Sequence, residues 1–150
     1  MVTASRGASL AISGYAVTTI DAVPSIDDEG VDWKPIQHYF QLTAFGINVY
    51  RATEVGTQVI GDHCERAGRH EEIYVVLDGS VRFTVGDDEF VCRRGSLVVV
   101  KDPTVVRGAV AETADAAVLA VGNREAERFE TTWRPEHFRG VPTYDDELGG

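Results

Sequence analysis

The stretch GDHCERAGRHEEIYVVLDGS, residues 61–80, holds most of the side chains in this sequence that can do chemistry. It contains His63, Glu65, His70 and Glu72 ahead of an apolar run. Imidazole nitrogens and carboxylate oxygens bind transition metals, and both groups also act as general acids and bases. The stretch therefore predicts a metal site or an acid–base site.

The spacing of these four residues decides whether they can converge. Side chains two apart on a β-strand point to the same face of the sheet. His63 and Glu65 share a face if one strand continues to Glu65, and His70, Glu72 and Tyr74 share a face if the next strand begins by His70. The alternative is a solvated loop between two strands, in which these charges face water and bind nothing.

Short strand-like runs broken by Gly, Asp and Pro fill residues 41–122. VRFTV alternates, whereas EIYVVL and LVVV are nearly continuous apolar runs that look buried, and no helical period of ten residues appears within residues 45–122. This pattern predicts an all-β sandwich or barrel. We expect its aromatic residues to lie in the core, namely Phe45, Tyr50, Phe83 and Phe90.

The residues from His70 onward resemble the cupin superfamily. The resemblance rests on Glu72, six residues and Gly79, on the phrase YVVLDG, and on RRGSLVVVKDP, which ends in Pro103. FGINVYRA and VLAVG also resemble small single-domain bacterial cupins. The resemblance implies a double-stranded β-helix, or jelly-roll barrel, over residues 40–122. We expect residues 1–39 to form an N-terminal arm and entry segment, and residues 123–150 a short helical or irregular tail.

The sequence departs from the cupin metal motif, which has a His-x-His pair, a glutamate and a later histidine. Glu65 stands in place of the second histidine, and His70 lies in a longer gap before Glu72. No histidine follows Pro103 in the second motif, and Arg107 lies close to the expected position. Arginine cannot bind a metal because it stays protonated. In the family the motif glutamate points into the barrel, so the resemblance implies the same for Glu72 and, by parity, for His70.

Two versions of the site stay open. In one, His63, Glu65, His70 and Glu72 bind a divalent transition metal, which would be Fe, Mn, Zn or Ni. In the other no metal is bound, a histidine or Glu72 does acid–base chemistry, and Arg107 holds an anionic group of the substrate. Arg107 has a second interpretation, as an exposed arginine on an edge strand. We predict His70, Glu72 and Arg107 as the catalytic set.

These residues predict a small-molecule-binding cupin. One hypothesis is an enzyme that acts on a small polar or aromatic metabolite by metal-assisted oxygenase or isomerase chemistry. The alternative is a metal-free binding module or acid–base catalyst with a degenerate metal site. The fold family does not decide between them, because cupins include enzymes, binding modules and storage proteins.

Charge and composition narrow the partners and the compartment. The formal net charge of −10 disfavours nucleic acid and anionic membranes as partners. Two cysteines form no disulfide framework, and the N-terminus is too polar for a signal peptide, so we expect a cytoplasmic protein. We also expect a homodimer, because sheet edges are commonly covered and cupins of similar length are usually dimeric. The N-terminal segment and the tail around Trp133 are the candidate contacts.

Overall fold

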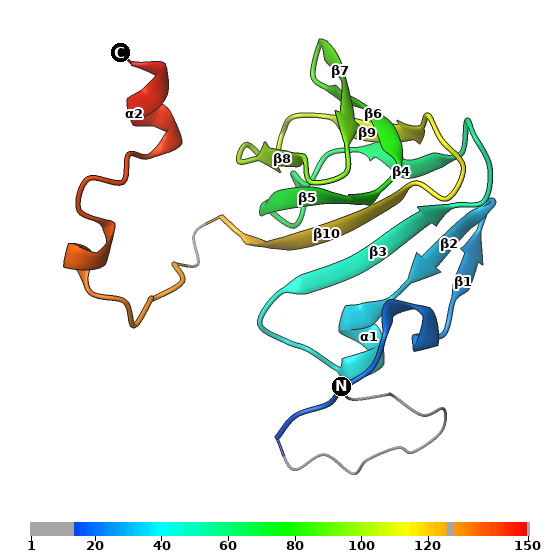
Figure 1. Ribbon diagram of the computed structural model, residues 1–150, viewed down its shortest axis with the longest axis horizontal. Coiled ribbons are helices and arrows are strands. Elements are labelled where there is room, and N and C mark those ends of the chain that lie inside the picture. Colours follow the sequence, from blue (N-terminus) through cyan, green and yellow to red (C-terminus); the bar gives the residue numbers. More distant parts are fainter. Residues whose placement is uncertain (1–13, 126–127, 150) are drawn as a thin grey trace.

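Two antiparallel sheets face each other and form the body of the protein (Figure 1). The computed structural model describes residues 14–125 and 128–149. The first sheet has the strand order β1-β2-β3-β10-β5-β8, and the second has the order β4-β9-β6-β7. The predicted all-β barrel is confirmed.

The strands are short and closely spaced along the chain, as the turn residues indicated. Their bounds are β1 Ile26–Asp28, β2 Val31–Lys34, β3 Gly46–Ala52, β4 Gln58–His63, β5 His70–Asp78, β6 Ser80–Val85, β7 Asp88–Arg93, β8 Leu97–Val100, β9 Arg107–Ala111 and β10 Ala117–Arg124. The helical segments are η1 Ile20–Ala22, α1 Ile36–Phe40, η2 Pro135–Phe138 and α2 Tyr144–Leu148. No helix of the described residues has the length and apolar content needed to cross a membrane.

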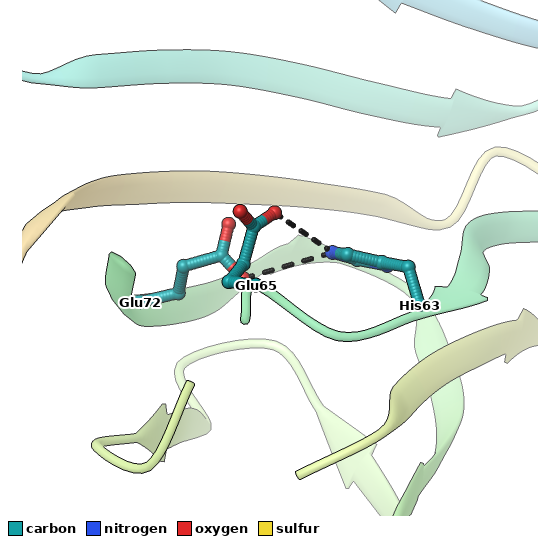
Figure 2. Close-up of side chains that lie close together, drawn as sticks. All are labelled: His63, Glu65 and Glu72. Atoms are coloured by element: carbon teal, nitrogen blue, oxygen red, sulfur yellow. Dashed lines mark ion pairs between the residues drawn. The ribbon is translucent and has the colours of Figure 1, made fainter. Parts of the chain in front are cut away.

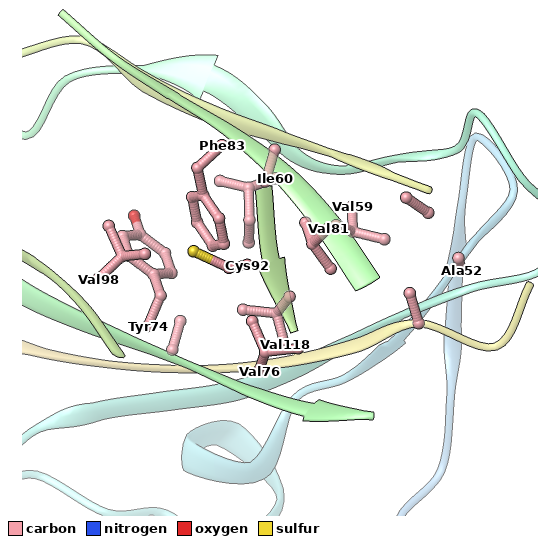
Figure 3. Packing of buried hydrophobic residues seen from close by; sticks show 14 of the residues in the cluster. Ala52, Val59, Ile60, Tyr74, Val76, Val81, Phe83, Cys92, Val98 and Val118 are labelled. Carbon is pink, nitrogen blue, oxygen red and sulfur yellow. The ribbon is translucent and has the colours of Figure 1, made fainter. Parts of the chain in front are cut away.

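The hydrophobic core lies between the two sheets (Figure 3). The alternation of VRFTV places Val81 and Phe83 inside, and both side chains are fully buried. Phe83 packs against Tyr74 of the opposite sheet, with ring centroids 5.7 Å apart. Each large apolar side chain buried in this way stabilises the fold by roughly 1.5–3 kcal/mol.

Four of the expected core positions are wrong. Phe45 and Phe90 are 42% and 38% exposed, because Phe45 precedes β3 at a cavity and Phe90 lies on the edge strand β7. The run LVVV is not buried throughout, because β8 is the edge strand of the first sheet. Val98 and Val100 point into the core, whereas Leu97 and Val99 point outward and are 62% and 58% exposed.

The described part of the N-terminal segment extends the first sheet. The hairpin of β1 and β2 pairs with β3, and the buried side chain of Lys34 anchors the residues before it. The Lys34 ammonium donates hydrogen bonds to the carbonyl of Val23 at 2.9 Å and to the hydroxyl of Ser25 at 2.8 Å. The predicted arm also includes residues 1–13, which lie outside the described residues.

The tail, residues 128–149, stands away from both sheets (Figure 1). It consists of η2, α2 and irregular segments, and the Thr143 side chain caps α2. Its large apolar side chains are exposed, including Phe129 at 91% and Trp133 at 64%. Within the tail, Trp133 packs edge-on against His137 with ring centroids 5.2 Å apart, yet it stays largely exposed.

Candidate functional site

The residues predicted to form the site come together because strands of both sheets meet at one end of the barrel. His63 ends β4 and lies opposite Arg107 of β9 in the second sheet. Glu72 of β5 lies opposite Val100 and Gly122 in the first sheet. Glu65 lies in the loop between β4 and β5, which is tied to the barrel by a hydrogen bond from its backbone N–H to the carbonyl of Pro103 at 2.8 Å.

Three of the four predicted metal ligands converge (Figure 2). One ligand atom from each of His63, Glu65 and Glu72 lies within 4.8 Å of the others. The His63 Nε2 atom is 3.4 Å from Oε1 of Glu65 and 3.8 Å from Oε2 of Glu72. All three side chains line a cavity of about 980 Å³.

The imidazole of His63 is oriented by its own strand. Its Nδ1 atom is 2.7 Å from the carbonyl oxygen of Gly61. Because a carbonyl only accepts hydrogen bonds, Nδ1 carries the proton, and in the neutral ring the lone pair is on Nε2. This lone pair faces two carboxylates, so the arrangement needs either a second proton on His63 or a cation between the three groups.

His70 lines the cavity but lies outside the group of converging ligand atoms. Its Nδ1 atom is 3.0 Å from Oε2 of Glu65, whereas His63 is near the other oxygen of that carboxylate. The ring packs on Gly68, where a Cβ atom would lie 2.8 Å from Cε1 of His70. His70 thus contacts the site through Glu65, and its roles as ligand and catalytic residue stay predictions.

Arg107 is fully buried and holds Glu72 from behind the cavity wall. Its Nε and one terminal nitrogen donate to Oε2 of Glu72 at 3.0 and 2.7 Å, and the other terminal nitrogen donates to the carbonyl of Val105 at 2.8 Å. The Tyr74 hydroxyl donates to the same Glu72 oxygen at 2.5 Å. Arg107 is therefore not the exposed arginine of the alternative interpretation. Its geometry fits a residue that positions Glu72, and its catalytic role stays a prediction.

Both tyrosines at the site are held in the protonated form. Burial, the charge of Glu72 and the hydrogen bond to it raise the pKa of Tyr74. Burial, followed by the charges of Glu72, Glu65 and Asp28, raises the pKa of Tyr50 to about 12. Both hydroxyls therefore stay hydrogen-bond donors at neutral pH.

The cavity wall includes residues that the sequence did not point to. Trp33 and Tyr50 stack with ring centroids 6.1 Å apart, and the indole N–H of Trp33 donates to the Asn48 side chain at 2.9 Å. Gly122 lies beside Glu72, where a Cβ atom would come within 3.0 Å of Cγ of Glu72. The signal that could have found two of them is the alternation in GINVY, because Asn48 and Tyr50 share a face.

Solved structures with a similar arrangement of strands identify the fold. A cupin protein from Bacteroides fragilis matches with a TM-score of 0.61 and 16% identity, over 81% of this chain and 93% of its own. The chain has the cupin fold. The double-stranded β-helix implied by the sequence resemblance is thus confirmed. No family model matches the sequence, and no curated protein matches it.

Two other cupin-fold structures carry more specific names. KdgF from Halomonas sp. has a TM-score of 0.58 and 17% identity, with 76% of this chain and 90% of that chain covered. A sugar phosphate isomerase of the cupin superfamily from Silicibacter pomeroyi has a TM-score of 0.55 and 21% identity. That match covers 64% of this chain and only 60% of the isomerase. At these identities the likeness concerns the cupin fold and not the activity.

The Arg107–Glu72 pair can be tested by a double-mutant cycle. We expect Arg107→Met to lower the free energy of unfolding by about 3–5 kcal/mol, because it leaves the carboxylate of Glu72 in the barrel without its cation. Adding Glu72→Gln should recover part of this loss, since the uncompensated charge is then gone. The measurement is urea unfolding.

Arg82 provides the matched control for this cycle. It forms a half-exposed ion pair with Glu112, the two side chains being 44% and 34% exposed, so Arg82→Met should cost no more than about 1 kcal/mol. Equal losses for Arg82→Met and Arg107→Met, or no recovery in the double variant, would contradict the buried pair.

The surroundings of Tyr50 can be tested by titrating its phenol. The difference in phenolate absorbance between the wild type and Tyr50→Phe should show a midpoint at about pH 12, against about 10 for an unperturbed tyrosine. Because the pKa is raised in the folded state, the contribution of Tyr50 to stability is complete below about pH 10 and is lost as the pH rises through its folded pKa. A midpoint near that of free tyrosine would mean that the hydroxyl faces water.

Proposed function

We propose that the cavity binds a divalent transition metal through His63, Glu65 and Glu72, and a small molecule beside it. The observation that carries this proposal is the Nε2 lone pair of His63, which faces two carboxylates at 3.4 and 3.8 Å inside a cavity. A cation between the three groups would offset the repulsion between the carboxylate of Glu65, the carboxylate of Glu72 and the Nε2 lone pair of His63, and a second proton on His63 is the alternative.

The donor set fits such a metal. One imidazole and two carboxylates suit Mn, Fe, Zn or Ni, and three protein ligands leave coordination positions for a substrate. The metal would act as a Lewis acid toward an oxygen of that substrate. Backbone and side-chain groups keep the ligands in place, because the carbonyl of Gly61 orients His63 while the side chains of Arg107 and Tyr74 hold Glu72.

The charges of the cavity wall indicate which small molecules fit. Five carboxylates line it, from Asp28, Glu29, Asp62, Glu65 and Glu72, and among the described residues no Lys or Arg does. Such a wall attracts cations and repels anions. Trp33 and Tyr50 add an aromatic surface, which favours apolar rings and also cations. We infer a small neutral or amine-bearing ligand with an apolar face. Among the described residues no Lys or Arg lines the cavity to bind the phosphate group of a sugar phosphate.

A second candidate is acid–base catalysis without a metal. It is favoured by the contact between His70 and Glu65, in which a carboxylate orients an imidazole that lines the cavity. A histidine held in this way can take a proton from a bound substrate. This version requires His70 for activity and requires no metal. The two candidates therefore differ in whether a substitution of His70 or a substitution of a metal ligand abolishes activity.

Metal content tests the first candidate. Untagged wild-type protein should hold, or take up, about one equivalent of Mn or Zn, and the melting temperature should rise with added metal, because only the folded site binds it. We expect His63→Ala and Glu65→Gln to lose this uptake. His70→Ala should keep it within about threefold, because His70 lies outside the converging ligand atoms. Metal is measured by elemental analysis after dialysis.

The exposed His137 gives a matched control, and His137→Ala should bind metal like the wild type. If the wild-type protein holds less than about a tenth of an equivalent of metal and takes up none when metal is added, the metal version is excluded. Loss of uptake in His70→Ala would instead show that His70 is a ligand.

The ligand class can be tested with probes that differ only in charge. Benzylamine, benzyl alcohol and benzoate share one ring, and Trp33 reports their binding by fluorescence in a Trp133→Phe background, where it is the only tryptophan. We expect benzylamine to bind at least about tenfold more tightly than benzoate, because the carboxylates of the wall attract the ammonium. Benzoate binding as tightly as benzylamine, or no binding by any probe, would overturn the inferred class without affecting the metal result.

A pair of double variants separates the local wall from the overall charge. Asp28→Asn with Glu29→Gln removes two carboxylates of the cavity, and Asp87→Asn with Asp88→Asn removes two outside it, one in the turn after β6 and one at the start of β7. Only the first should reduce the preference for benzylamine.

A further inference from the structure

The loop between β4 and β5, which carries Glu65, is held by hydrogen bonds between backbone groups. The N–H of Glu65 donates to the carbonyl of Pro103 at 2.8 Å, and the N–H of Arg69 donates to the carbonyl of Glu65 at 2.6 Å. The second of these bonds closes residues 65–69 into a single turn. The position of Glu65 in the site therefore depends on where the chain places Arg69.

Arg69 extends the pairing of β5 with β10 by one residue. His70 lies opposite Arg124, and the N–H of Glu125 donates to the carbonyl of Arg69 at 2.8 Å. The side chains of Arg69 and Glu125 also form an ion pair. The Nε atom and one terminal nitrogen of Arg69 donate to Oε1 of Glu125 at 2.9 and 2.5 Å. Arg69 is thus bound to Glu125 through both its backbone and its side chain.

The backbone conformation of Arg69 indicates that its side chain matters. Its φ of 57° lies in the left-handed region, which residues other than glycine adopt infrequently. A glycine would adopt this conformation without strain. An arginine at such a position therefore points to a role for the side chain, and the ion pair with Glu125 is the contact that this side chain makes.

The end of β10 links this loop to the other carboxylate of the site. Gly122 lies opposite Glu72, and a Cβ atom at Gly122 would come within 3.0 Å of Cγ of Glu72. Glu125 follows three residues after Gly122. Because a strand rises about 3.3 Å per residue, only about 10 Å of backbone separates the two contacts. One short segment of chain therefore positions Glu72 directly and Glu65 through Arg69.

We propose that Arg69 and Glu125 are positioning residues for Glu65, which keep its carboxylate beside His63 and Glu72. This inference rests on the proposed metal site and names the contact that fixes one of its three ligands. Six residues separate Glu65 from Glu72, a longer gap than in the cupin motif. A longer loop has more conformations to lose when it is ordered, and the ion pair restricts them. Groups that orient a metal ligand in this way raise the affinity for the metal.

The exposure of the ion pair sets the size of the expected effect. The side chains of Arg69 and Glu125 are 64% and 30% exposed, so water weakens their attraction. Glu65 also keeps its hydrogen bond to Pro103 when the ion pair is lost. We therefore expect the loss of the pair to weaken metal binding by about three- to fivefold and not to abolish it.

Titration of the full chain with Mn²⁺, followed by electron paramagnetic resonance, tests the proposal. Arg69→Met and Glu125→Gln should each weaken binding about three- to fivefold, and the double variant should lose no more than either, because the two side chains form one contact. Arg69→Lys should recover part of the affinity, because lysine keeps the charge without the planar fork. Arg69→Gly should bind as weakly as Arg69→Met although it relieves the backbone.

Arg82 and Glu112 provide matched controls. Their ion pair is similarly exposed, and neither residue lines the cavity. Arg82→Met and Glu112→Gln should therefore leave the affinity for Mn²⁺ unchanged. Circular dichroism of all variants checks that the barrel is folded.

Amide hydrogen exchange of the metal-free protein, measured by NMR, tests the same contact without metal. Arg69→Met should speed the exchange of the Glu65 and Glu125 amides about three- to fivefold, because the ion pair no longer opposes opening of the loop. Wild-type protein that takes up no metal would refute the proposed function, and the exchange rates would still decide whether the pair holds Glu65. Unchanged exchange, faster exchange with unchanged Mn²⁺ affinity, or an equal loss of affinity in Arg82→Met would overturn the proposal.

Discussion

The site depends on one buried ion pair that joins the two sheets. Arg107 of β9 reaches across the barrel to Glu72 of β5 and occupies a single oxygen of that carboxylate, together with Tyr74. The β4–β9 ladder that carries Arg107 also carries His63, its partner in the register. The pairing of β4 with β9 therefore positions both Arg107 and His63 relative to Glu72. The geometry of the site thus depends on how the two sheets are placed relative to each other.

Local pattern predicted the parts of this structure that depend only on parity. The alternation in VRFTV gave Val81 and Phe83 as core, and the two-residue spacing gave Glu72 and Tyr74 a common face. Parity does not say which strands become neighbours. The burial of Arg107 follows from β9 pairing with β4 and β6, and the exposure of Phe90 follows from β7 having a neighbour on one side only. The aromatic wall was missed for the same reason, because the strand that carries Trp33 joins the sheet through β3.

The two faces of the first sheet carry different kinds of side chain on the same strands. Glu72 and Ile73 are neighbours on β5, yet Glu72 lines the cavity and Ile73 lies on the opposite face of the sheet. Gly122 and Val121 repeat this arrangement on β10. A change that flattened or twisted this sheet from its outer face would move the inner residues as well, because a strand is a single backbone.

The burial of Arg107 also limits which substitutions such a barrel can accept during evolution. A histidine at this position would bring another imidazole beside His63, but its shorter, weaker cation would leave Glu72 and Tyr74 poorly compensated in the interior. The substitution of Arg107 by histidine would therefore add a metal ligand and lower the folding stability at the same time. Lineages that keep one arrangement or the other are therefore expected to change positions 72, 74 and 107 together, as a covarying set rather than one residue at a time.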